Sequence, residues 1–151
     1  MRAILSSWVF WALLSASSAA LTAIFGKIGV EGIGSDFATL IRTIVILPLL
    51  AFMVALSGTW QPVGSISGKT ILFLVLSGIA TGISWLCYYR ALQLGPVSGV
   101  ASVDKMSVLL VALIAFLFLG EKLMLRNWIG IGLIVIGTVL VAMRGRAFTL
   151  L

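Results

Sequence analysis

Five long apolar stretches dominate the chain, and short polar segments separate them. The stretches cover about residues 4–25, 38–56, 70–89, 96–119 and 127–143. A helix needs about 20 apolar residues to cross the hydrocarbon core of a bilayer, so each stretch is long enough for one crossing. The separating segments carry glycine and proline, which favour turns. The pattern therefore predicts five transmembrane helices, and the short loops make successive helices antiparallel.

Polar side chains recur at helical spacing in the first, third and fourth stretches. In the third, Ser77, Thr81, Ser84 and Tyr88 follow at intervals of four, three and four residues, which places them on one helix face. Hydroxyl groups in membrane helices commonly face other helices, so we predict that these three helices line a polar passage. The alternative is that each hydroxyl bonds a carbonyl of its own helix, four residues earlier. The matching stripes are Ser15, Ser18 and Thr22 in the first stretch and Ser98, Ser102 and Lys105 in the fourth.

The composition supports a membrane location. Hydrophobic residues make up 62% of the chain and charged residues 9%, whereas a soluble domain carries about 25% charged residues. We therefore predict an all-α integral membrane protein with a single five-helix domain over residues 1–151. A cleaved signal peptide is the alternative for the first stretch, because Arg2 precedes it and residues 17–19 are small. The apolar run continues to Phe25, which favours a membrane span.

The rare polar residues exclude several kinds of chemistry. The chain has no histidine, one cysteine (Cys87) and four acidic residues. A metal cluster, an intrachain disulfide and a nucleophile–base pair are therefore not expected, and we predict neither a cofactor nor an enzyme. The net charge is +6, but the basic residues are scattered between apolar runs. This distribution indicates membrane flanks rather than a nucleic-acid surface.

Three charged residues fall inside the apolar stretches. Arg42 lies about one turn inside the second, and Asp104 and Lys105 lie about 12–14 Å from the start of the fourth, at 1.5 Å per residue. A charge at that depth is costly unless it is paired or hydrated, which favours a functional role. Neighbouring helical residues point about 100° apart, so Asp104 need not pair with Lys105 and can face Arg42 or Arg90. The structural alternative is an Arg42–Asp104 pair that only sets helix register.

These patterns define the candidate site. We predict that the charged residues and the hydroxyl stripes contact a small-molecule substrate in the passage, with Asp104 as the acid that exchanges a proton. The candidate substrate-binding residues are Arg42, Thr81, Ser84, Ser102, Asp104 and Lys105.

Several short motifs resemble the EamA domain of the drug/metabolite transporter superfamily. They are Ala91-Leu-Gln-Leu-Gly-Pro96, Ser102-Val-Asp-Lys-Met-Ser107, Phe116-Leu-Phe-Leu-Gly-Glu-Lys122 and Trp128-Ile-Gly-Ile-Gly-Leu-Ile-Val-Ile-Gly137. The resemblance is to the short bacterial members with one five-helix repeat. It implies a secondary transporter, often an exporter of amino acids, metabolites or drugs, in the bacterial inner membrane. Larger relatives carry two inverted repeats around a cavity lined by the first, third and fourth helices of each.

Two hypotheses about function follow. The first is a small-molecule transporter that works as a homodimer by alternating access, because one repeat needs a second copy to complete a pathway. The second is a non-transporting membrane subunit that packs against a larger partner. The second hypothesis uses the glycine faces of the helices, such as Gly130 and Gly137, which lie seven residues apart on one face of the fifth stretch.

The distribution of basic residues bears on the orientation of the chain. Basic residues near span ends set orientation, with the excess on the cytoplasmic side. Here four lie on each side: Arg2, Lys69, Lys122 and Arg126 on the N-terminal side, and Lys27, Arg90, Arg144 and Arg146 on the other. This balance predicts insertion in both orientations and an antiparallel homodimer, with a parallel dimer of one fixed orientation as the alternative.

Overall fold

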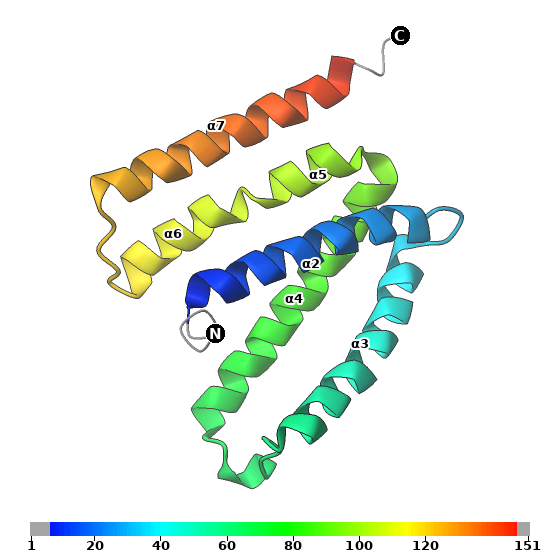
Figure 1. The fold of residues 1–151 in the computed structure, drawn as a ribbon, viewed down its shortest axis with the longest axis vertical. Helices are drawn as coiled ribbons and strands as arrows, with labels where there is room; N and C mark the ends of the chain where they lie inside the picture. The colour runs from blue at the N-terminus through cyan, green and yellow to red at the C-terminus, as the bar shows by residue number, and fades with distance from the viewer. Residues whose placement is uncertain (1–6, 148–151) are drawn as a thin grey trace. The chain divides into compact units, whose positions relative to one another are not determined.

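The computed structural model describes residues 7–147, and it describes side chains for residues 7–143. Arg2 and the expected first-span start at Ile4 lie outside the described residues, as do the side chains of Arg144 and Arg146. The described chain is helical and contains no strand. Its elements are the helices α2 (Trp8–Gly29), α3 (Ser35–Ser57), α4 (Gly68–Leu94), α5 (Val97–Asp104), α6 (Ser107–Phe118) and α7 (Leu125–Ala147), with a short 3₁₀ helix η1 (Val63–Ser65) (Figure 1).

Five helical segments are long and apolar enough to cross a membrane. Their mean hydropathy lies between 1.7 and 2.3, and α5 with α6 forms one of the five. At most 11% of each apolar segment is buried within the chain. Outward-facing apolar side chains are what a lipid environment requires. The all-α membrane fold with five spanning helices is therefore confirmed.

Three of the observed helices, α3, α4 and α7, extend beyond the predicted spans at both ends. The third was expected over residues 70–89, but α4 continues to Leu94, where Gly95 and Pro96 follow. Leu92, in this extension, is completely buried. Hydropathy locates the part of a helix that suits the hydrocarbon core, whereas packing and turn residues decide where the helix ends.

The fourth span departs most from the prediction. We predicted one helix over residues 96–119, but α5 ends at Asp104 and α6 begins at Ser107 (Figure 1). At the break, backbone N–H groups bond carbonyls three residues earlier instead of four, which is 3₁₀ spacing. An apolar run does not reveal such a change in backbone bonding. The bonds are Lys105 N–H to Ser102 O (3.0 Å), Met106 N–H to Val103 O (2.9 Å) and Val108 N–H to Lys105 O (3.0 Å).

The helices belong to two compact units. The first contains α2 up to Lys27 together with α5, α6 and α7, and the second runs from Ile28 to Gln93. A single domain over the whole chain therefore stays a prediction.

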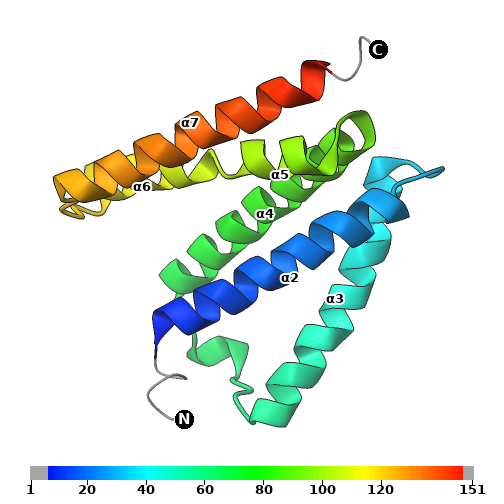
Figure 2. The same ribbon diagram turned by 45° about the horizontal axis from the view of Figure 1, so that its top comes forward.

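In the first unit, α7 packs along both α5 and α6 (Figures 1 and 2). The residues of α7 that face α5 and α6 are spaced three or four apart, as expected for one side of a helix. The rings of Phe116 and Trp128 meet edge to face with centroids 6.1 Å apart, and Thr138 is buried. The buried and half-buried residues of this face are Trp128, Ile131, Val135, Thr138 and Ala142.

In the second unit, α3 and α4 run antiparallel and are joined through η1 (Figure 1). The segment before α3 is held by Gln93, near the end of α4. Its amide Nε2 donates to the carbonyl oxygens of Val30 at 3.3 Å and Ile33 at 2.7 Å. Val30 and Ser35 are buried here. This contact fixes the start of α3 against the end of α4.

Candidate functional site

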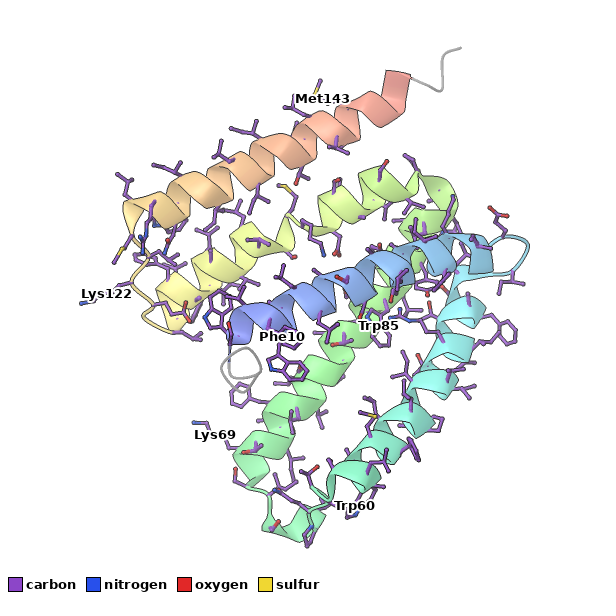
Figure 3. All side chains as sticks on the ribbon, in the orientation of Figure 1. Phe10, Trp60, Lys69, Trp85, Lys122 and Met143 are labelled. Atoms are coloured by element: carbon purple, nitrogen blue, oxygen red, sulfur yellow. The ribbon has the colours of Figure 1, made fainter. Side chains whose placement is uncertain are left out.

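Arg42 lies over two aromatic rings of α4. Its guanidinium carbon is 4.0 Å from the ring centroid of Trp85 and 5.3 Å from that of Tyr89. Trp85 lies on the side of α4 towards α3 (Figure 3). The two rings are four residues apart and so lie one turn apart on α4. These distances are typical of cation–π contacts, which stabilise a desolvated guanidinium.

Arg42 has no acidic partner in its own unit. The acidic residues between Ile28 and Gln93 are Glu31 and Asp36, and neither has a carboxylate oxygen within 4.0 Å of the guanidinium nitrogens. Asp36 instead accepts a hydrogen bond from the Ser35 hydroxyl at 3.2 Å. The half-buried Arg42 therefore carries a positive charge that aromatic rings stabilise and no carboxylate of this unit neutralises.

Asp104 and Lys105 pair with each other at the break between α5 and α6. The ammonium nitrogen of Lys105 lies 3.3 Å from Oδ2 of Asp104. The side chain of Lys105 is 58% exposed and that of Asp104 is 40% exposed, so a ligand or a partner chain can reach them. The sequence did not require this pairing, because adjacent side chains diverge on a regular helix.

Several predicted hydroxyl groups bond their own helix. Thr81 donates to the carbonyl of Ser77 at 2.8 Å, and Thr22 donates to that of Ser18 at 2.9 Å. The alternative interpretation of the stripes is therefore observed at these positions. By contrast, the hydroxyls of Ser84 and Ser102 make no hydrogen bond with any residue that the structure describes. These two remain available to a ligand.

The six candidate residues fall into two groups. Arg42, Thr81 and Ser84 belong to the unit of α3 and α4, and Ser102, Asp104 and Lys105 belong to the unit of α5 and α6. Within the first group, Thr81 and Ser84 precede Trp85 on α4 by four residues and one residue. A passage shared by both groups, and an Arg42–Asp104 pair, stay predictions.

The comparisons with known proteins identify the family. The sequence profile of the EamA-like transporter family matches residues 6–143. The chain belongs to this family. This EamA protein is 59% identical over 136 residues to a Sinorhizobium sp. protein named "Uncharacterized transporter in cobO 3'region", which covers 90% of this chain and 96% of that protein.

More distant relatives of this EamA chain carry a more specific name. Proteins of Yersinia pseudotuberculosis and Yersinia pestis are 33% identical to this chain over 82 residues. The matched region is 54% of this chain and 72% of the length of each relative. They are named "Probable 4-amino-4-deoxy-L-arabinose-phosphoundecaprenol flippase subunit ArnE". No solved structure matches the chain significantly. The EamA chain is thus a multi-pass membrane protein of a transporter family whose relatives include a flippase subunit.

The structure of the EamA chain assigns contacts that sequence reasoning missed. Trp85 and Tyr89 are not among the predicted site residues, yet both rings contact the guanidinium of Arg42. The available signal for this contact was the spacing of the two aromatic residues, four apart, together with an arginine inside the preceding apolar stretch. Lys27 was counted only as a membrane flank, but its ammonium donates to the carbonyl of Gly95 at 3.2 Å. No sequence pattern marks a contact between residues so far apart in the chain.

The glycine face of α7 has space for side chains, although Gly130 is half-buried. A Cβ atom added at Gly130 or at Gly137 would meet no side chain within 4 Å among the described residues. This face lies away from the stripe through Trp128 and Thr138 that contacts α5 and α6. A packing role for these glycines, within the subunit or between subunits, stays a prediction from their spacing.

Proposed function

We propose that this protein is a secondary transporter that exports a small metabolite, an amino acid or a drug by alternating access. It acts as a homodimer in the inner membrane of a bacterium. The observation that carries this proposal is the Asp104–Lys105 ion pair at a break inside a spanning helix.

The position of the pair suits a transport site. Lys105 is the ninth residue of the span Val97–Phe118, so it lies about 12 Å from the start at 1.5 Å per residue. That depth is close to the middle of a hydrocarbon core about 30 Å thick. Secondary transporters commonly bind substrate and coupling ion near the midplane, where a helix is discontinuous. Lys105 and Ser102 would then contact substrate.

The ion pair also suggests how a proton is coupled to transport. When Asp104 is ionised, its carboxylate can hold either Lys105 or a cationic group of the substrate. Protonation of Asp104 from the outer side of the membrane removes that attraction and releases the substrate group there. The 3₁₀ turn at Lys105 and Met106 supplies a point about which α6 can move relative to α5. Loss of the proton on the inner side makes Asp104 ready for the next substrate molecule, so that proton entry drives export.

A specific observation favours a second candidate function. The Yersinia relatives are named as flippase subunits, and the matched region is 72% of their length. By this analogy the chain would be a membrane subunit that packs against a different partner. In that case the open face at Gly130 and Gly137 would bind the partner rather than a second copy.

Reconstitution into vesicles tests the proposal. Wild-type protein alone should accumulate substrate from a pool of metabolites, and Asp104→Asn should abolish uptake while it inserts and purifies normally. Asp36→Asn is the matched control, because Asp36 is an exposed acid in the first turn of α3. Full uptake by Asp104→Asn would contradict the mechanism. Uptake that appears only after a second protein is added would favour the subunit function.

A further inference from the structure

We infer that Arg42 anchors an oxyanion, a phosphate or carboxylate group, of the transported molecule. This inference rests on the proposed function and deepens it by naming a class of substrate. It depends on the charge balance around Arg42, on its contact with the two rings, and on the groups of its guanidinium that remain unbonded.

The two intramembrane cations, Arg42 and Lys105, differ in whether an acidic side chain lies beside them. Lys105 has the carboxylate of Asp104 at 3.3 Å. Arg42 has no carboxylate within 4.0 Å in the unit from Ile28 to Gln93. A cation inside a membrane protein without an acidic neighbour attracts an anionic ligand, because neutralisation there offsets the cost of removing the charge from water.

The aromatic contact leaves the hydrogen-bond donors of the guanidinium for a ligand. The guanidinium carbon lies 4.0 Å from the Trp85 ring centroid, a distance at which the ring stabilises the charge. A guanidinium carries five N–H donors in one plane. None of them makes a hydrogen bond with a described residue. Two parallel N–H groups match the two oxygens of a carboxylate or phosphate.

The rings also restrict the motion of Arg42. Tyr89 is 6% exposed, and its ring centroid lies 5.3 Å from the guanidinium carbon. An arginine held in this way loses less conformational freedom on binding than a free side chain, which strengthens binding. The neighbouring cation Arg90 is exposed and makes no such ring contact, so it differs from Arg42 in this respect.

Trp85 provides a direct reporter of binding. An oxyanion that binds the guanidinium changes the electrostatic field at the indole ring, and so the fluorescence of Trp85. The contribution of Trp85 is the part of the emission that the Trp85→Phe variant lacks. The measurement uses the full-length protein, titrated in detergent with inorganic phosphate or acetate. In parallel it is titrated in phosphatidylcholine nanodiscs with or without phosphatidic acid.

The expected result is a saturable change of Trp85 emission in the wild type and in the control Arg90→Gln, but none in Arg42→Gln. Arg42→Lys keeps the positive charge but loses the two parallel N–H donors of the guanidinium, so this variant should bind the oxyanion about tenfold more weakly or worse. A response to inorganic phosphate or acetate identifies a soluble oxyanion, and a response only to phosphatidic acid identifies a lipid headgroup. Either supports the inference.

Two results would overturn the inference. One is the absence of any Trp85 response to all three anions, and the other is an equal response in Arg42→Gln and the wild type. If Arg42→Gln cannot be purified, equal affinity in Arg42→Lys and Arg90→Gln overturns it. The titration requires no transport. Binding without uptake therefore contradicts only the proposed function, and uptake without binding contradicts only the oxyanion site.

Discussion

Arg42 and Lys105 show two ways in which one residue can carry a charge inside an apolar helix. Arg42 lies over the rings of Trp85 and Tyr89, and Lys105 lies 3.3 Å from a carboxylate. The first arrangement leaves the positive charge uncompensated within its unit, and the second neutralises it. The two arrangements are the basis of the proposals that an anion binds at Arg42 and that a proton exchanges at Asp104.

The ion pair predicts that one charge left without its partner lowers stability more than removal of both charges. Lys105→Gln leaves the Asp104 carboxylate without its partner, whereas the double variant Asp104→Asn/Lys105→Gln removes both charges. We expect the single variant to be the less stable of the two, by about 1 kcal/mol, since both side chains are substantially exposed. Thermal unfolding in one detergent measures the difference. Equal stability of the two variants would show that the unpaired Asp104 carboxylate costs no stability.

At the scale of elements, long-range polar contacts join helix ends that are distant in the sequence. Gln93 holds the segment before α3, and Lys27 at the end of α2 holds the carbonyl of Gly95. Both contacts satisfy backbone carbonyls near the ends of helices, where no intrahelical donor is available. Polar side chains at helix ends thus position α3 relative to α4 and link α2 to the segment before α5.

Removal of the Gln93 amide should loosen the start of α3. Gln93→Ala deletes the donor to Val30 and Ile33, and each lost hydrogen bond costs about 1 kcal/mol. We therefore expect a lower midpoint of thermal unfolding and faster proteolysis between α2 and α3. Gln61→Ala is the matched control, because Gln61 is exposed in the connection between α3 and α4. An equal effect of the two variants would contradict the role of Gln93.

The predicted passage can be mapped by thiol labelling. Cysteines placed at Ser84 and Lys105 in a Cys87→Ala background should react with a charged thiol reagent, because we expect both positions to face water. A cysteine at Gly137, on the open glycine face of α7, should be protected by lipid or by another subunit. Labelling at Gly137 but not at Ser84 or Lys105 would reverse the assignment of the helix faces.

At the scale of the whole molecule, one five-helix repeat has an odd number of spans, so its two ends lie on opposite sides of the membrane. Arg2 lies outside the described residues, and the side chains of Arg144 and Arg146 are not described. The other counted cations lie at or near helix ends: Lys27, Lys69, Arg90, Lys122 and Arg126. An inverted pair of identical chains would reproduce the two-repeat arrangement of the larger relatives.

The charge balance predicts that the chain inserts in both orientations. Reporters active only in the cytoplasm or only in the periplasm, fused after Leu151, should give comparable signals. One or two added lysines near either end should shift the whole population to one orientation. A signal from one reporter alone would contradict dual topology and favour the parallel dimer.

The sequence by itself determined the class of fold and the family. Apolar length and helical spacing depend on local residues, so they predicted five spans, the charged positions Arg42, Asp104 and Lys105, and the EamA resemblance. The hydroxyl stripes were also visible in the sequence. Their local backbone bonds, as at Thr81, were foreseen only as an alternative.

Only the tertiary structure decided which groups meet. The choice of Trp85 and Tyr89 as partners of Arg42 depends on how α3 packs against α4, and hydropathy carries no information about that packing. The break at Lys105 depends on backbone hydrogen bonds that an apolar run does not encode, and the pairing of Lys105 with Asp104 depends on the conformations of the two side chains. In a membrane helix nearly every position is apolar, so helix faces are poorly distinguished by composition. Contacts between the few polar side chains then define the candidate site.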